Sequence, residues 1–193
     1  MSLSICSKMN GYEVIHYMNL NFAECVDRAR QGDADAFADL YSLVYKDLYH
    51  IALLNLKNQH DASDVVSDTV LEAYSSIKKL RDENAFKSWI VKILTVKIKN
   101  KQREYIKNNN YQKELDILDS VEQEKNHEIN YSGMEIMEEF KRLSKEERLV
   151  LSLSVVSGYR SEEIAGMLGT NSNTVRSKVA RAKIKLKQLL TQK

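Results

Sequence analysis

The sequence predicts an all-α protein, and three observations support this. The 193-residue chain contains no proline and only six glycines, so it has few of the residues that join strands through tight turns. Apolar residues recur at three- and four-residue steps over long stretches, which is the helical period. Between residues 104 and 135 this period fades, and eight acidic residues stand against three basic ones. We therefore expect two small helical domains joined by a flexible acidic linker.

The first domain is expected at residues 21–103, after an N-terminal extension of residues 1–20. Its first long helix carries "FADLYSLVYKDLYHIA", in which the apolar residues form one stripe. The preceding "GDADAF" supplies a glycine break and an aspartate cap. A second helix is expected from Asp61 to about Ile77, and a third carries "NAFKSWIVKILTVKIKNKQRE". These helices would bury a modest core.

The linker is expected at residues 104–133, and the second domain at residues 134–193. Four short helices are predicted in this domain. The second of them begins with Ser144 and Glu147, which have the spacing of a capping box. The last two lie in "EEIAGMLGTNSNTVRSKVARA", which has the spacing of a helix-turn-helix.

Three residues define this helix-turn-helix spacing. Ala165 is small where two crossing helices approach, Gly169 suits the turn, and Val175 packs the second helix against the first. Asn171 is placed to cap the second helix. Because the apolar residues face inward, the outward face consists of Asn173, Thr174, Arg176, Ser177, Lys178 and Arg181.

The last helix is strongly basic: residues 170–190 contain six basic residues and no acidic one. In the major groove of DNA, arginine can contact guanine, asparagine can contact adenine, and lysine can contact phosphate. A solvated surface helix with excess lysine is the alternative. The helix-turn-helix spacing favours DNA binding, because docking in the groove requires it.

A second basic stretch covers residues 84–103, with six basic residues and no acidic one. The aromatic residues Phe86 and Trp89 stand at its start. Basic residues beside aromatic ones are typical of surfaces that bind single-stranded or melted DNA, although large aromatic residues are more often buried in a core.

The stretch "DASDVVSDTVLEAY" forms an acidic stripe, which we define as Asp61, Asp64, Asp68 and Glu72. Like charges four residues apart repel slightly along a helix, so the stripe predicts a basic partner. The alternative is that the first two aspartates favour the helix N-terminus and the rest is a solvated face.

Other classes of function find no support in the sequence. No glycine-rich phosphate loop, catalytic triad or apolar carboxylate pair is present, so we expect neither an enzyme nor a cofactor. Cys6, Cys25 and the four histidines lack metal-ligand spacing, and the cysteines are expected to be free thiols. No apolar run is long enough to span a membrane, and we expect a cytoplasmic protein.

These motifs, in this order, resemble the extracytoplasmic-function (ECF) sigma factors, a two-domain group of the sigma-70 family of bacterial RNA polymerase. The matching stretches are "GDADAFADLYSLVYKDLYHIA", "DASDVVSDTVLEAY", "FKSWIVKI", "LSKEERLVLSL", "SEEIAGMLG" and "NTVRSKVARAKIKLKQLL". The resemblance implies a factor that binds core RNA polymerase and promoter DNA in a stress or envelope response. It also implies an anti-sigma factor as a partner, with the chain monomeric when free or in that complex.

The resemblance also implies three binding surfaces, and the acidic linker would thread the polymerase cleft. The surface that binds the polymerase clamp corresponds to Asp61, Asp64, Val65, Asp68, Leu71 and Glu72. The part that recognises the melted minus-ten element corresponds to Lys79, Arg81, Asn84, Phe86, Lys87, Trp89 and Lys92. Recognition of the minus-thirty-five element corresponds to Asn171, Ser172, Asn173, Thr174, Arg176, Ser177, Lys178 and Arg181.

The chain departs from the family pattern at four positions. Leu94 and Val96 stand where a small residue and an asparagine are usual, Asn100 where aspartate is common, and Ser144 where proline is common. Two other functions remain open at this point. One is a helix-turn-helix regulator of another kind, and the other is a helical adaptor with a basic tail.

Overall fold

The computed structural model describes residues 22–115, 139–140 and 142–191, and in these ranges it contains helices and turns but no strand. The all-α prediction is confirmed. The expected N-terminal extension and most of the expected linker lie outside the described residues. After a helical stretch at 22–30, the elements are α2 (Ala34–Leu56), α3 (Gln59–Ser76), the 3-10 turns η2 (Ile77–Lys79) and η3 (Glu83–Ala85), α4 (Phe86–Leu115), α6 (Lys145–Val155), α7 (Ser161–Leu168) and α8 (Ser172–Thr191).

Local sequence signals explain where the early helices begin. Gly32 has a φ of 101°, a conformation that favours glycine, and it lies in the turn that separates the helical stretch at 22–30 from α2. The side chain of Asp33 then accepts hydrogen bonds from the backbone N–H groups of Asp35 and Ala36, both at 3.0 Å. Asn58 caps α3 in the same way, through a 3.1 Å bond from the N–H of Asp61. The second helix therefore begins at Gln59, slightly earlier than expected.

The third helix is longer than the sequence predicts. α4 continues from Phe86 to Leu115, so residues 104–115, which were assigned to the linker, are helical. The extension has a packing reason at its start, because the Tyr105 hydroxyl donates a hydrogen bond to the Asp61 carboxylate of α3. A polar composition and a weak apolar period do not exclude a helix.

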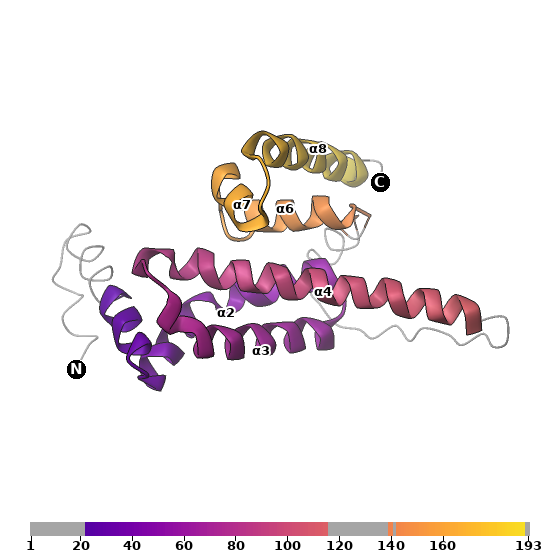
Figure 1. Ribbon diagram of the computed structural model, residues 1–193. Helices are drawn as coiled ribbons and strands as arrows, with labels where there is room; N and C mark the ends of the chain where they lie inside the picture. Colours follow the sequence, from indigo (N-terminus) through magenta and orange to yellow (C-terminus); the bar gives the residue numbers. More distant parts are fainter. Residues whose placement is uncertain (1–21, 116–138, 141, 192–193) are drawn as a thin grey trace.

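The helices form two groups that pack against each other (Figure 1). The first group consists of α2, α3 and α4, and the second of α6, α7 and α8; α6 contacts α2, and α7 contacts α4. A buried polar seam joins the groups: the Asn55 side-chain amide of α2 donates to the Ser152 hydroxyl of α6 at 3.0 Å. Beside this bond, and within the first group, the Gln102 amide of α4 donates to the Asn55 backbone carbonyl at 3.3 Å. The sequence did not predict this docking, because it pointed only to two domains on a linker.

A capping box fixes the N-terminus of α6, the first helix of the second group. Ser144 and Glu147 form the predicted capping box, with the Ser144 hydroxyl accepting from the Glu147 N–H at 3.3 Å. In return, the Glu147 carboxylate accepts from the Ser144 N–H at 2.8 Å. This backbone bond is the main reason that the pKa of Glu147 lies below its usual value, and bonds to Ser144 and Lys185 side chains add to the effect.

We predict that Ser152→Ala lowers the free energy of unfolding by about 1–3 kcal/mol, because it leaves a buried N–H of Asn55 without its acceptor. Urea denaturation of the full chain measures this loss. Ser154→Ala, on the same helix but only partly buried, is the matched control and should cost less than about 0.5 kcal/mol. Equal losses from both substitutions would show that the seam bond contributes nothing specific.

We predict that Glu147→Gln destabilises the protein at neutral pH and that the difference from the wild type disappears in acid. The folded-state pKa of Glu147 is lowered, so its stabilising contribution is present above the usual glutamate pKa of about 4.3. That contribution is lost as the pH falls through the folded-state pKa. Thermal unfolding of both proteins between pH 7 and pH 3 measures the difference, and a constant gap over this range would contradict the prediction.

Candidate nucleic-acid and protein-binding surfaces

The turn between α7 and α8 has the backbone that a helix-turn-helix needs. Gly169 ends α7 in the left-handed conformation at φ 64°, and its N–H donates to the Ala165 carbonyl. The side-chain oxygen of Asn171 accepts a 2.8 Å hydrogen bond from the N–H of Asn173 at the start of α8. Ala165 is buried between the helices. The structure thus confirms the predicted turn conformation of Gly169 and the predicted capping of α8 by Asn171.

One face of α8 packs inward, and the other carries the predicted DNA contacts. Val175, Val179 and Ala182 are buried, and α8 contacts both α6 and α7. Figure 1 shows α8 on the side of its group that faces away from α4. Of the eight residues assigned to the minus-thirty-five element, Ser172 and Lys178 are half-buried, and the exposed ones are Asn171, Asn173, Thr174, Arg176, Ser177 and Arg181.

Carboxylates from α6 and α7 bind three of the basic side chains on α8. Arg176 donates to Glu162 of α7 at 2.8 Å and to Asn173 at 3.0 Å. Lys185 lies 3.4 Å from Glu147 of α6. Lys178 forms an ion pair with Glu146, and the hydrogen bond from this lysine is the main reason that the pKa of Glu146 is lowered.

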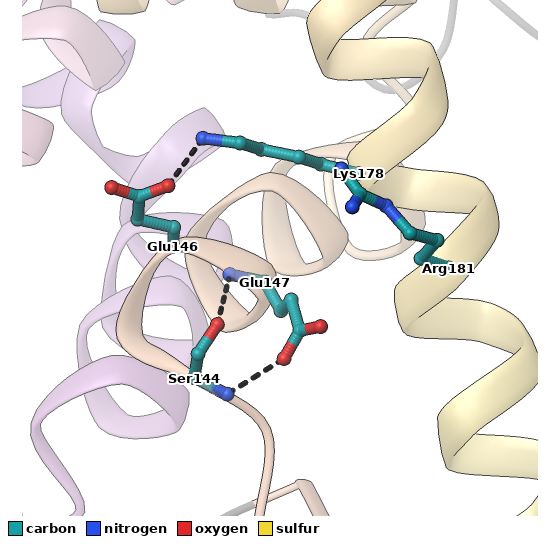
Figure 2. A pocket seen from close by; sticks show the side chains of 5 residues that line it. All are labelled: Ser144, Glu146, Glu147, Lys178 and Arg181. Atoms are coloured by element: carbon teal, nitrogen blue, oxygen red, sulfur yellow. Dashed lines mark hydrogen bonds and ion pairs between the residues drawn. The ribbon is translucent and has the colours of Figure 1, made fainter.

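Figure 2 shows the Lys178–Glu146 pair beside the α6 capping box. The lysine reaches across from α8, and Arg181 lies on the same side of that helix. Ser144, Glu146, Glu147, Lys178 and Arg181 line a pocket of about 190 Å³ between the N-terminus of α6 and α8. The sequence did not predict these acidic partners, because they come from other helices and share no periodic spacing with α8.

Two carboxylates of the acidic stripe on α3 form ion pairs with α4, and the other two do not. Glu72 pairs with Lys97 of α4 at 2.7 Å, and Asp61 pairs with Lys101 of α4 at 2.9 Å. Burial opposes ionisation of Asp61, but the hydrogen bonds from Tyr105 and Lys101 outweigh it and lower its pKa. The basic partner that the stripe predicts is therefore provided in part by α4 itself.

The remaining carboxylates and one leucine form an open surface on α3. Asp64 and Asp68 are exposed, and the Leu71 side chain between them and the end of the helix is 68% exposed. Val65 was assigned to the same surface, but it is only 5% exposed and belongs to the core. We define the α3 surface as Asp64, Asp68 and Leu71.

The residues assigned to the minus-ten element fall into two groups. Phe86 is fully buried, and its ring contacts those of Phe22, Phe37 and Trp89 at centroid distances of 6.1, 6.5 and 6.1 Å. Phe86 is therefore a core residue and cannot receive a base at the surface of this structure. Trp89 is half-buried. The exposed members are Lys79, Arg81, Asn84, Lys87 and Lys92.

Among the described residues, no group of three or more histidine, cysteine, aspartate or glutamate side chains has the geometry to hold a metal ion. None of the helices in that part of the chain combines the length and apolar character needed to span a membrane.

Comparison with known proteins identifies the family. Residues 40–106 match Sigma-70 region 2, and residues 133–186 match Sigma-70 region 4. The RNA polymerase sigma factor SigV of Bacillus subtilis is 31% identical over 140 residues, which span 71% of this chain and 80% of SigV. The ECF RNA polymerase sigma factor SigM of Mycobacterium tuberculosis is 26% identical over 159 residues, which span 82% of this chain and 79% of SigM.

A solved structure agrees on the fold. The sigma factor RpoE of Bartonella quintana, determined in complex with the anti-sigma factor NepR, aligns with a TM-score of 0.67 at 24% identity. The alignment covers 80% of this chain and 96% of RpoE. The two regional matches follow the order of α2–α4 and α6–α8, and they agree with the relatives. The chain therefore belongs to the ECF sigma factors of bacterial RNA polymerase, within the sigma-70 family.

Proposed function

We propose that this sigma factor binds core RNA polymerase through the α3 surface and recognises promoter DNA through α8 and the start of α4. Membership of the family makes the protein a non-enzymatic factor of transcription initiation, and it rules out the other two functions left open by the sequence. One observation carries the proposal: the α3 surface and the outward face of α8 both stay exposed while the two helical groups are packed together.

The composition of the α3 surface suits a basic protein partner. Two exposed carboxylates provide steering and register, and an exposed leucine beside them provides apolar area that a partner can bury. The coiled coil of the polymerase clamp, which the family resemblance implies, is the partner that we assign to it.

The outward face of α8 suits duplex DNA. Its first turns expose asparagine, threonine and arginine side chains that can donate to base edges, and the basic residues further along can contact phosphate. We assign the minus-thirty-five element to α8. For the minus-ten element, the exposed residues Lys79, Arg81, Asn84, Lys87 and Lys92 remain the candidates, with Trp89 as the half-buried aromatic.

Control by an anti-sigma factor in a stress or envelope response completes the proposal. RpoE, which shares the fold, was solved in complex with an anti-sigma factor. A protein that covered the α3 surface and α8 would block both proposed functions at once.

We predict that Asp64→Lys together with Asp68→Lys weakens binding to core RNA polymerase at least about tenfold, because it reverses the charge of the α3 surface. Asp39→Lys with Asp47→Lys introduces the same charge change at exposed positions of α2 and is the matched control. Titration of labelled protein with core enzyme at several salt concentrations measures the effect. Equal losses in both variants would show a response to net charge alone and would contradict the assignment.

We predict that Arg176→Ala costs about 1–3 kcal/mol on the cognate upstream element and much less on a scrambled one, because it removes a base contact. Lys187→Ala, at an exposed position later in α8, should weaken both DNAs equally or not at all. Holoenzyme binding to both duplexes measures these effects. Equal losses on the two duplexes for Arg176→Ala would remove this residue from base recognition.

A further inference from the structure

We propose that Glu162 is a positioning residue for DNA recognition, holding the Arg176 guanidinium in a fixed orientation before DNA binds. The inference rests on the proposed role of α8 in recognising duplex DNA. Glu162 lies in the first turn of α7, fourteen residues before Arg176, and the helix-turn-helix motif that contains it gave it no role.

The geometry around Arg176 supports this role. One terminal nitrogen of its guanidinium donates to Glu162 at 2.8 Å, and the other donates to the Asn173 side-chain oxygen at 3.0 Å. The side chain is thus bound from two sides, by another helix and by its own helix. A guanidinium has more N–H donors than these two bonds use, so it can still donate to a base edge.

The exposure of the pair excludes a mainly stabilising role. The Arg176 and Glu162 side chains are 62% and 60% exposed, and exposed ion pairs contribute little to folding. What the pair changes is the freedom of a long side chain. An arginine that is already ordered loses less rotamer entropy when it binds, so the contact with its correct base becomes more favourable.

Glu162 also adds a negative charge next to the DNA-binding face. Binding that depends on phosphate alone is opposed by this charge, whatever the base sequence. The correct base offsets the repulsion by engaging the oriented arginine, whereas a wrong base does not. The carboxylate should therefore increase discrimination between duplexes more than it increases affinity for any of them.

The Lys178–Glu146 pair provides an internal comparison. Glu146 also places a carboxylate against a basic residue of α8, but from α6 and on a lysine. A lysine ammonium is a compact charge without the planar geometry of a guanidinium, so fixing it favours no particular base. Removing Glu146 changes the charge near the DNA by the same amount and leaves Arg176 untouched.

The test is a double-mutant cycle in the full-length protein assembled with core RNA polymerase. The probes are the upstream element that wild-type holoenzyme selects from a randomised duplex library and a scrambled version of it. The measured quantity is the discrimination ratio, which is the dissociation constant for the scrambled duplex divided by that for the selected duplex. Glu162→Ala should lower this ratio about two- to tenfold, the range expected from ordering one long side chain. Glu162→Gln, which keeps the acceptor oxygen, should restore part of it.

The Arg176→Ala background separates positioning from other effects. Glu162→Ala should have no further effect on the ratio there, because the side chain that it orients is absent. Glu146→Ala should change the affinity for both duplexes alike and leave the ratio unchanged. The inference would be overturned if Glu162→Ala lowered the ratio further in the Arg176→Ala background. It would also be overturned if Glu162→Ala alone kept the wild-type ratio. Either result would leave the role of Arg176 intact. An unchanged ratio in Arg176→Ala itself would overturn the base-recognition role and the inference with it.

Discussion

The buried hydrogen bond from the Asn55 side-chain amide of α2 to Ser152 of α6 ties the two helical groups together at one defined point of their shared core. The same amide donates to the Ile51 carbonyl of its own helix, and Gln102 of α4 donates to the Asn55 backbone carbonyl, so the polar groups at this point have partners on three helices. Once α6 is placed, α7 and α8 follow, because both pack on it.

Pairing of opposite charges inside the chain decides which charges are left for partners. Lys97 and Lys101 neutralise two carboxylates of the acidic stripe, so the basic stretch on α4 is not wholly available to DNA. On α8 the same principle acts in the opposite direction, since acidic residues of α6 and α7 bind basic side chains of the recognition helix. Near-neutral overall charge therefore conceals surfaces of defined sign and position.

Features controlled by neighbouring residues were predictable. The Ser144–Glu147 capping box, the left-handed Gly169 and the inward-facing Val175 each depend on a few adjacent positions, and the structure confirms all three. Contacts between helices were not predictable, because Glu162 with Arg176 and Asn55 with Ser152 depend on how helices pack. The burial of Phe86 likewise reflects packing against rings from two other helices. The extension of α4 was missed because a solvated helix and a polar linker have similar compositions.

The length of α4 limits how far apart the two helical groups can move. Twelve residues that would reach about 40 Å as extended chain span only about 18 Å as helix. Residues 116–138, in whatever conformation they adopt, can connect α4 to the second group over at most about 80 Å. Any arrangement in which the two helical groups move apart must stay within this reach, whichever partners they bind.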